Sequence, residues 1–234
     1  MLILIPPSEG KTKIKSTGVK FNKTNFIFRN EVKIIVDLLE NLSELGEDIR
    51  SIYGTSIEKS ELFHRQNQDV FNSRCAKAIE RYTGVVYEHI NWATLNPKAQ
   101  QYMEKHVRIF SGLFGMITPE TLIPNYKLKM NVLSLQYHWN PILTKTLEKE
   151  KMILDLLPQV HRKAYKPNKE NVIPVDFQIT NKGKKSAAGH FGKAVKGEFI
   201  RYIAENNITD IEGFSGFEYE GFTWDGTSFV KESS

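Results

Sequence analysis

The sequence has a single cysteine, Cys75, and no long run of apolar residues among its 234 residues. One cysteine cannot form an internal disulfide, and without a CxxC partner it does not point to a redox pair or a thiolate metal site. A membrane-spanning helix needs about 18 apolar residues in a row, so we expect no membrane partner. The N-terminal apolar run is short and has no basic segment before it, which argues against a secretory signal and favours a cytoplasmic protein.

Paired histidines and nucleophile motifs are also missing. None of the six histidines lies four residues from another, the spacing that binds a metal on a helix, so we expect no metal and no organic cofactor. Ser8 and Ser111 follow apolar runs, but neither lies in a Gly-x-Ser-x-Gly elbow. The sequence therefore assigns no catalytic residue, and both serines are better explained as anion ligands or capping residues.

A complete phosphate-binding P-loop is absent as well. The triplet Gly10-Lys11-Thr12 follows the first apolar run and matches the end of that motif. Ile5 stands where the motif requires its first glycine, and Pro6 and Pro7 remove two amide donors from the loop. We therefore exclude a P-loop and keep Lys11 as a candidate ligand for a phosphate or another anion.

Three short apolar runs, each followed by polar or turn residues, are the strongest structural signal that the sequence does contain. They cover residues 1–5, 107–110 and 152–157 and are typical of buried strands. The carboxyl ends of parallel strands meet at one edge of a sheet, where α/β proteins tend to place their sites. After the second run, Gly112 and Gly115 let the backbone turn tightly or approach a ligand closely.

The remaining pattern alternates helices with further short strands. Helical periodicity or boundary signals predict helices over residues 31–42, 72–82, 97–106 and 193–206. Residues 85–87 and 213–226 are typical of strands, and a hairpin is expected around 181–184, with Asn181 and Gly183 at positive φ. This order predicts a single-domain α/β (mixed α+β) protein over residues 1–234, with a central mixed sheet flanked by helices and a basic cleft.

The charges are modest in sum and uneven in position. The net charge is +5, yet residues 182–201 carry six basic residues against one acid, and residues 205–234 are mostly acidic among their charges. The N-terminal loop between residues 11 and 23 adds five lysines. Such segregation favours a polyanionic partner, although a charge run is often just a solvated face.

Five blocks of the sequence carry a family resemblance. They are Leu4–Thr12, Arg81–Tyr87, Phe110–Gly115, Pro124–Met130, and His190–Gly197 with Arg201. In this order, and over nearly the whole chain, they resemble the YaaA-like peroxide-stress-resistance proteins. The resemblance implies protection against hydrogen peroxide, in part through iron homeostasis, and binding of duplex or branched DNA through a basic cleft. It implies no particular enzymatic reaction.

Three parts of the sequence depart from the family pattern. Lys127 stands where the family has arginine, which keeps the positive charge but loses the planar fork of donors. Gly189 and Gly192 replace a serine and an asparagine, and Pro158 and His161 replace a serine and a tyrosine. Roles that depend on those family side chains are therefore in doubt for this chain.

These observations predict a basic cleft that binds DNA without regard to sequence. The candidate anion- or DNA-binding residues are Ser8, Lys11, Arg108, Ser111, Gly112, Tyr126, Lys127, His190, Lys193, Lys196 and Arg201. Lys193 and Lys196 lie three apart at the start of the last helix, so we expect both to project from one side of its surface. The alternative is a structural network in which Glu9 and Asp155 neutralise the cations.

A second function remains open from the sequence alone. No helix-hairpin-helix motif can be read around residues 52–63, so DNA binding rests on charge and on the resemblance. The same residues would suit an enzyme acting on a small anionic or phosphorylated substrate. A broad exposed groove would favour DNA, whereas a closed pocket would favour the enzyme.

Overall fold

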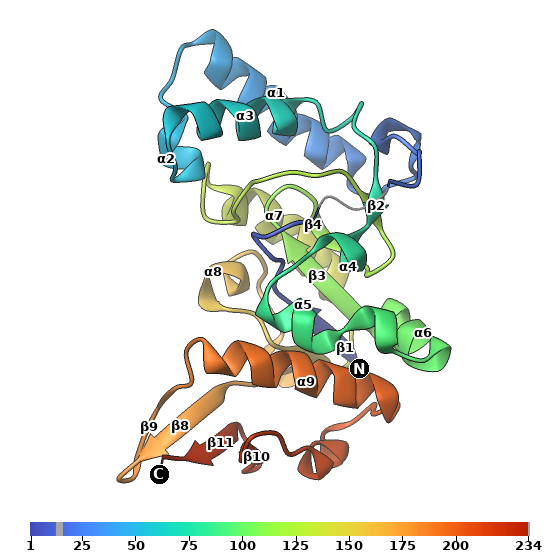
Figure 1. The fold of residues 1–234 in the computed structure, drawn as a ribbon, viewed down its shortest axis with the longest axis vertical. Helices are drawn as coiled ribbons and strands as arrows, with labels where there is room; N and C mark the ends of the chain where they lie inside the picture. The colour runs from blue at the N-terminus through green and yellow to red at the C-terminus, as the bar shows by residue number, and fades with distance from the viewer. Residues whose placement is uncertain (13–15, 234) are drawn as a thin grey trace.

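The computed structural model describes residues 1–12 and 16–233, so Lys13 and Lys15 of the N-terminal loop lie outside the described part. In Figure 1, helices α1 (Arg29–Glu44) and α3 (Ile57–Gln68) form one end of the molecule and α9 (Phe191–Glu205) crosses near the other. A central sheet lies between them. The buried hydrophobic residues of these layers belong to one cluster.

The central sheet has five strands in the order β4-β3-β1-β6-β7. Its strands are β1 (Leu2–Ile5), β3 (Val107–Ser111), β4 (Gly115–Ile117), β6 (Ile153–Asp155) and β7 (Val172–Pro174). β4 is antiparallel to β3, and the other neighbours are parallel, which confirms the predicted mixed sheet. Every residue of β1 is buried, as expected for a continuous apolar run in a sheet covered on both faces. The carboxyl ends of β1, β3 and β6 therefore share one edge.

Two smaller sheets complete the strands. One contains β8 (Phe177–Asn181), β9 (Lys184–Ala187), β10 (Thr223–Trp224) and β11 (Phe229–Glu232). The other is the pair β2 (Ala76–Lys77) and β5 (Leu122–Ile123). The predicted hairpin is the β8–β9 pair. Its turn places Lys182 at φ 47° and Gly183 at φ 77°, so the prediction of positive φ holds for Gly183 and is wrong for Asn181. The turn residues Lys182 and Gly183 lie at the centre of the predicted range 181–184.

Three of the four predicted helices form close to their expected bounds, namely α1, α6 (Pro97–His106) and α9. α6 begins where the Asn96 side chain accepts a hydrogen bond from the Ala99 amide at 2.9 Å, with Pro97 in the first helical position. The further helical segments are α2 (Arg50–Tyr53), α7 (Leu135–Leu147), α8 (Gln159–Arg162), η1 (Phe21–Lys23), η2 (Trp92–Thr94), η3 (Lys169–Asn171) and η4 (Ile211–Gly216). Within the described residues, no helix combines the length and apolar character needed to cross a membrane.

Two secondary-structure predictions are wrong. The helix expected over 72–82 is limited to α4 (Ala78–Arg81), and the strand expected at 85–87 is the start of α5 (Val85–Ile90). Tertiary packing explains the second error, because a Cβ atom on Gly197 of α9 would lie 2.5 Å from the Val86 carbonyl oxygen. The close approach of α5 and α9 that this glycine permits outweighs the strand preference of two valines and a tyrosine. The predicted late strands begin only after η4.

Candidate functional site

A cavity of about 580 Å³ opens at the carboxyl edge of the central sheet. The loops that follow β1 and β6 form part of its wall, and residues 83–87, the segment 126–131 and the start of α9 form the rest. Its volume lies within the range of small-molecule sites, roughly 300–1,000 Å³. Glu9 is the only acidic side chain among the described residues that line it, beside several lysines and two histidines.

Lys11 lies in this wall with little to balance its charge. Its Nζ donates a hydrogen bond to the Ser8 carbonyl oxygen at 2.9 Å and lies 4.1 Å from the ring centre of Tyr126 and 5.1 Å from that of Tyr82. Burial, and then the nearby charge of Lys127, lower the pKa of Lys11 to about 7. Lys11 forms no ion pair with a described carboxylate.

A chain of hydroxyl groups fixes the aromatic wall beneath Lys11. The Tyr126 hydroxyl is 2.6 Å from the Tyr82 hydroxyl and 2.7 Å from the Ser111 Oγ, which also accepts a hydrogen bond from the Phe114 amide. Ser111 is fully buried and does not line the cavity. Burial raises the pKa of Tyr126 to about 12, so this hydroxyl stays protonated. Ser111 therefore orients Tyr126 and does not reach a ligand itself.

Lys196 enters the cavity from α9 and is also without a carboxylate partner among the described residues. Its Nζ donates to the Leu156 carbonyl oxygen, and burial, followed by the charge of Arg162, lowers the pKa of Lys196 to about 8. Asp155 favours the charged form of Lys196 but forms no ion pair with it, because this carboxylate pairs with Arg162 at 3.1 Å and accepts a hydrogen bond from Tyr165 at 2.8 Å. Lys193 and Lys196 both line the cavity, as expected for two side chains that project from one side of α9, and Lys196 is half-buried there.

His161 adds a neutral polar group to the same part of the cavity. Burial, and then the charge of Lys196, lower the pKa of His161 to about 4, so the ring is uncharged at neutral pH. Its Nδ1 atom is buried and has no hydrogen-bond partner within the described protein. An unpaired buried nitrogen in a cavity wall is a candidate contact for a ligand.

Lys127 is held differently from the other two lysines. Glu9 forms ion pairs with the Nζ atoms of Lys127 at 2.8 Å and Lys129 at 3.2 Å, so Lys127, unlike Lys11 and Lys196, has a carboxylate partner. The backbone of Lys127 is clamped by the fully buried Asn67, which accepts from the Lys127 amide at 3.0 Å and donates to its carbonyl oxygen at 2.8 Å. Asn67 was not predicted, because a lone asparagine within a helix carries no pattern that marks such a contact.

The structure brings most of the predicted site residues together. Those that line the cavity are Ser8, Lys11, Tyr126, Lys127, His190, Lys193 and Lys196. Gly112 lies behind the wall, where an added Cβ atom would be 2.6 Å from the Leu128 carbonyl oxygen, and so permits close packing of the segment 126–131. The predicted basic cleft stays a prediction, because the structure shows only that these residues line one cavity.

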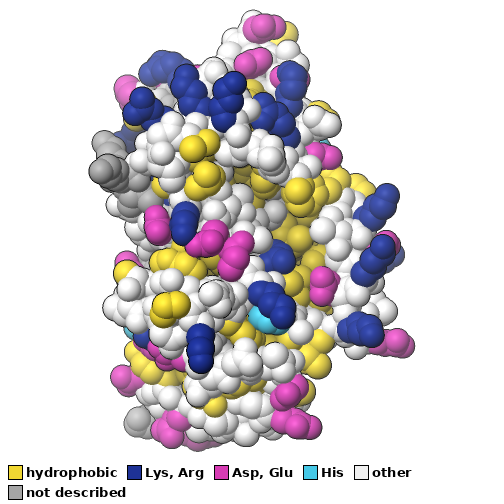
Figure 2. All heavy atoms as spheres, turned by 90° about the vertical axis from the view of Figure 1, so that its right-hand side faces the viewer, with side chains coloured by type: hydrophobic (Ala, Val, Ile, Leu, Met, Phe, Trp, Pro, Cys, Tyr) yellow, Lys and Arg dark blue, Asp and Glu magenta, His cyan; other side chains and the backbone are white. Residues whose placement is uncertain are grey.

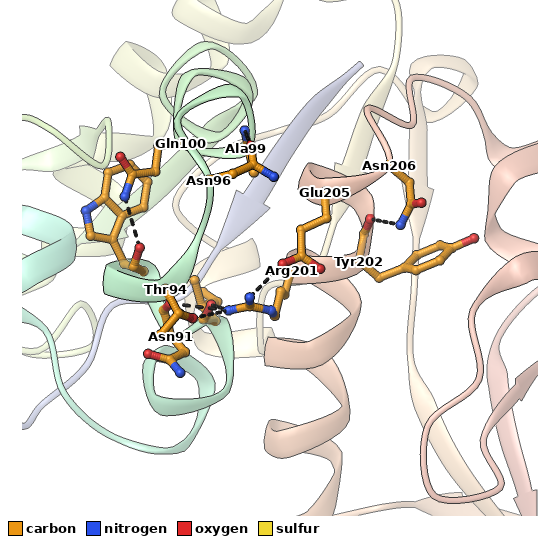
Figure 3. Close-up of polar contacts among 11 residues, drawn as sticks. Asn91, Thr94, Asn96, Ala99, Gln100, Arg201, Tyr202, Glu205 and Asn206 are labelled. Carbon is orange, nitrogen blue, oxygen red and sulfur yellow. Dashed lines mark hydrogen bonds and ion pairs between the residues drawn. The ribbon is translucent and has the colours of Figure 1, made fainter.

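Arg108 and Arg201 do not line this cavity, so the expectation of one shared cleft is wrong for Arg108. Arg108 pairs in register with Leu4, before the end of its strand, and donates to the Glu104 and Val107 carbonyl oxygens. Arg201 points toward η2, as Figure 3 shows, and donates to Thr94 and Glu205. Arg201 thus ties α9 to the η2 segment.

The balance of charges in the cavity favours an anionic ligand. Lys11 and Lys196 lack carboxylate partners among residues 1–12 and 16–233, while Glu9 and Asp155 are engaged with other cations. Like charges brought together without compensation are unfavourable, so a bound anion would stabilise the arrangement. In the same described part of the chain, no group of three or more His, Cys, Asp or Glu side chains is placed to hold a metal.

Comparison with known proteins places this chain in a family. It is similar to UPF0246 proteins of Phocaeicola vulgatus, 30% identical over 63% of this chain and 64% of the relative, and of Neisseria meningitidis serogroup A, 29% identical over 95% and 92%. A UPF0246 protein of Polynucleobacter asymbioticus is 28% identical over 96% and 93%. The matches to the Phocaeicola and Neisseria gonorrhoeae relatives span just under two thirds of those proteins. The model of the family described as peroxide stress protein YaaA matches residues 1–228, and the chain belongs to that family.

Proposed function

We propose that the protein acts in the defence against peroxide stress as an enzyme on a small anionic compound, which binds in the cavity beside Lys11 and Lys196. The family description supports the role in peroxide stress. The rest of the proposal is carried by two half-buried lysines that have no carboxylate partner among the described residues and that line one cavity of small-molecule size. A nonspecific DNA groove would be served best by exposed cations along an open surface, whereas these two lysines are half-buried in the wall of a cavity.

The lysines of the cavity divide into three roles in this proposal. Lys196, with the exposed Lys193 one turn earlier on α9, binds the anionic group of the substrate. Lys127 pairs with Glu9 and shapes the wall. Lys11, with a pKa of about 7, exchanges a proton with the substrate, because a general acid or base is most effective when its pKa lies near the working pH.

Ligand screening by thermal shift tests the binding step. Small carboxylates and phosphate esters are screened against the wild type, Lys11→Met, Lys196→Met and the surface control Lys149→Met. We expect selected anions to raise the melting temperature of the wild type and the control, by mass action, and not of the two cavity variants. If no anion stabilises the wild type, or if the cavity variants respond equally, the proposal is wrong.

A metabolite extract tests the catalytic step. Purified protein is incubated with the extract, and anionic metabolites are followed by mass spectrometry. We expect the wild type to consume an anionic compound that the double variant Lys11→Met/Lys196→Met leaves unchanged. The same double variant should fail to restore peroxide resistance to a strain that lacks the protein. Full restoration by a folded double variant would contradict the proposal.

Nonspecific DNA binding stays a second prediction, favoured by a separate observation. Lys182 and Lys184 are exposed on the β8–β9 hairpin, and Lys193 is exposed at the start of α9. Contacts to about 4–6 phosphates would give a log–log salt slope of roughly −3.5 to −5.5 for the binding constant. Fluorescence anisotropy with duplexes of unrelated sequence measures it, and absence of binding at low salt would eliminate this function.

A further inference from the structure

A second cavity, of about 590 Å³, lies where β1 and β3 begin, at the end of the sheet opposite the candidate site. Figure 2 views the molecule from the side on which Figure 1 places α6, and hydrophobic side chains gather there in a hollow beside Lys and Arg side chains. The apolar lining of the cavity comes from the loop before α1, from β4 and β5, and from the end of α7. Nothing in the proposed function uses this cavity.

Arg108 lines this cavity and is the feature that defines its chemistry. Its Nη1 atom donates to the carbonyl oxygens of Glu104 at 3.2 Å and Val107 at 2.8 Å, and these bonds fix the guanidinium group. The Nε and Nη2 atoms have no hydrogen-bond or ion-pair partner among the described residues. Their N–H groups form the edge of the guanidinium that binds a carboxylate through two parallel hydrogen bonds.

The described charged residues that line this cavity are Arg108, Lys23 and Glu150, so its charge is close to balanced once a single negative charge is bound. Glu104 and Glu150 lie near enough to favour the charged form of Arg108, while burial, the larger effect, lowers its pKa. Glu150 also lines the cavity and would repel a second negative charge on a ligand. Most of the remaining wall is apolar, including Phe26, Ile117 and Leu147, and such a wall favours a hydrocarbon body.

We infer that this cavity binds a monocarboxylate with an apolar chain, whose carboxylate pairs with the free edge of Arg108 and whose chain lies along the hydrophobic wall. The exposed side chain of Ile27 at the rim extends the apolar surface beyond the cavity itself. This site is independent of the cavity that contains Lys11. It gives Arg108 an anion-binding role, although not in the cleft where the sequence placed it.

Isothermal titration with sodium decanoate tests the site, with 1-decanol as the control for the apolar chain alone. We expect decanoate to bind the wild type at least about tenfold more tightly than decanol, because only the acid pairs with Arg108. Arg108→Met should weaken decanoate about 10- to 100-fold, whereas Arg65→Met, at an exposed arginine, should not. Glu150→Gln should strengthen decanoate binding, because it removes a negative charge that repels the carboxylate of the ligand.

Several outcomes would overturn the inference. Equal binding of decanoate and decanol, or full binding to Arg108→Met, would show that Arg108 does not recognise the acid. Loss of decanoate binding in Lys11→Met would place the ligand in the other cavity. If Arg108→Met does not fold, Arg108→Lys replaces it, and an unchanged affinity there would equally contradict two-point recognition by the guanidinium.

Discussion

Replacing Lys11 by methionine should change how the stability of the protein depends on pH. Burial lowers the pKa of Lys11 from 10.5 to about 7, so above pH 7 the unfolded chain still holds a proton that the folded protein has lost. Stability rises with pH wherever the unfolded state binds more protons, which for this group covers the window from about pH 7 to 10.5. Met fills a similar volume and does not titrate.

The size of the effect follows from the two pKa values. Between pH 7 and 9, Lys11 should add about 2 kcal/mol to the free energy of unfolding of the wild type. The ring faces of Tyr126 and Tyr82 favour the charged amine and reduce this gain, so we expect about 1–2 kcal/mol. The free energy of unfolding of the wild type should therefore rise by that amount relative to that of Lys11→Met between pH 7 and pH 9.

Urea denaturation at pH 7 and pH 9 measures the difference between the two proteins. Titrating groups that do not interact with Lys11 contribute equally to both proteins, so they cancel in the comparison. Lys149→Met, at an exposed lysine, controls for the general loss of a positive charge. A difference between wild type and Lys11→Met that is the same at both pH values, or a variant that gains on the wild type as the pH rises, would show that Lys11 does not have the lowered pKa.

Three further outcomes are expected from single changes. Asn67→Ala should lower the free energy of unfolding by about 2 kcal/mol in urea, because it leaves the amide and carbonyl groups of Lys127 without their buried partners; a change below about 0.5 kcal/mol would contradict the clamp. Gly112→Ala should cost about 2 kcal/mol or more, since its Cβ atom would lie 2.6 Å from the Leu128 carbonyl oxygen, and a neutral effect would contradict that close packing. Burial raises the pKa of the Cys75 thiol to about 11, so native protein at pH 7 should resist a thiol reagent and hydrogen peroxide while urea-unfolded protein reacts; rapid modification of the native thiol would contradict this.

The strands and long helices could be predicted because local pattern and tertiary environment agree. The run at residues 2–5 is apolar throughout and is buried on both faces of a sheet. α6 was predictable from its boundary signals, the Asn96 cap and Pro97. α5 was not, because contact with α9 through Gly197, distant in sequence, decides its conformation. A single sequence shows local preference and not the neighbour that overrides it.

The candidate site could be predicted in part for the same reason. Because strand ends meet at one edge of the sheet, the sequence correctly placed Lys11 and Tyr126 in one site. Lys196, on α9, lines the same cavity. Arg108 was misplaced because its strand runs on to Ser111, so this residue pairs opposite Leu4 before the strand ends. The burial of Lys196 and the contact of Asn67 with Lys127 depend on the packing of segments far apart in sequence, which charge and spacing do not encode.

Titration of the lysine amines by NMR, with and without an anion, is the most direct test of the claim that Lys11 and Lys196 lie in a site that binds an anionic ligand. Lysine is labelled with ¹³C, and the variants Lys11→Met and Lys196→Met assign the two signals. The account predicts midpoints near pH 7 and pH 8 in the free protein, and a rise of both when inorganic phosphate or a selected anion binds. Midpoints near the ordinary lysine value of about 10.4, unchanged by every anion tested, would contradict it.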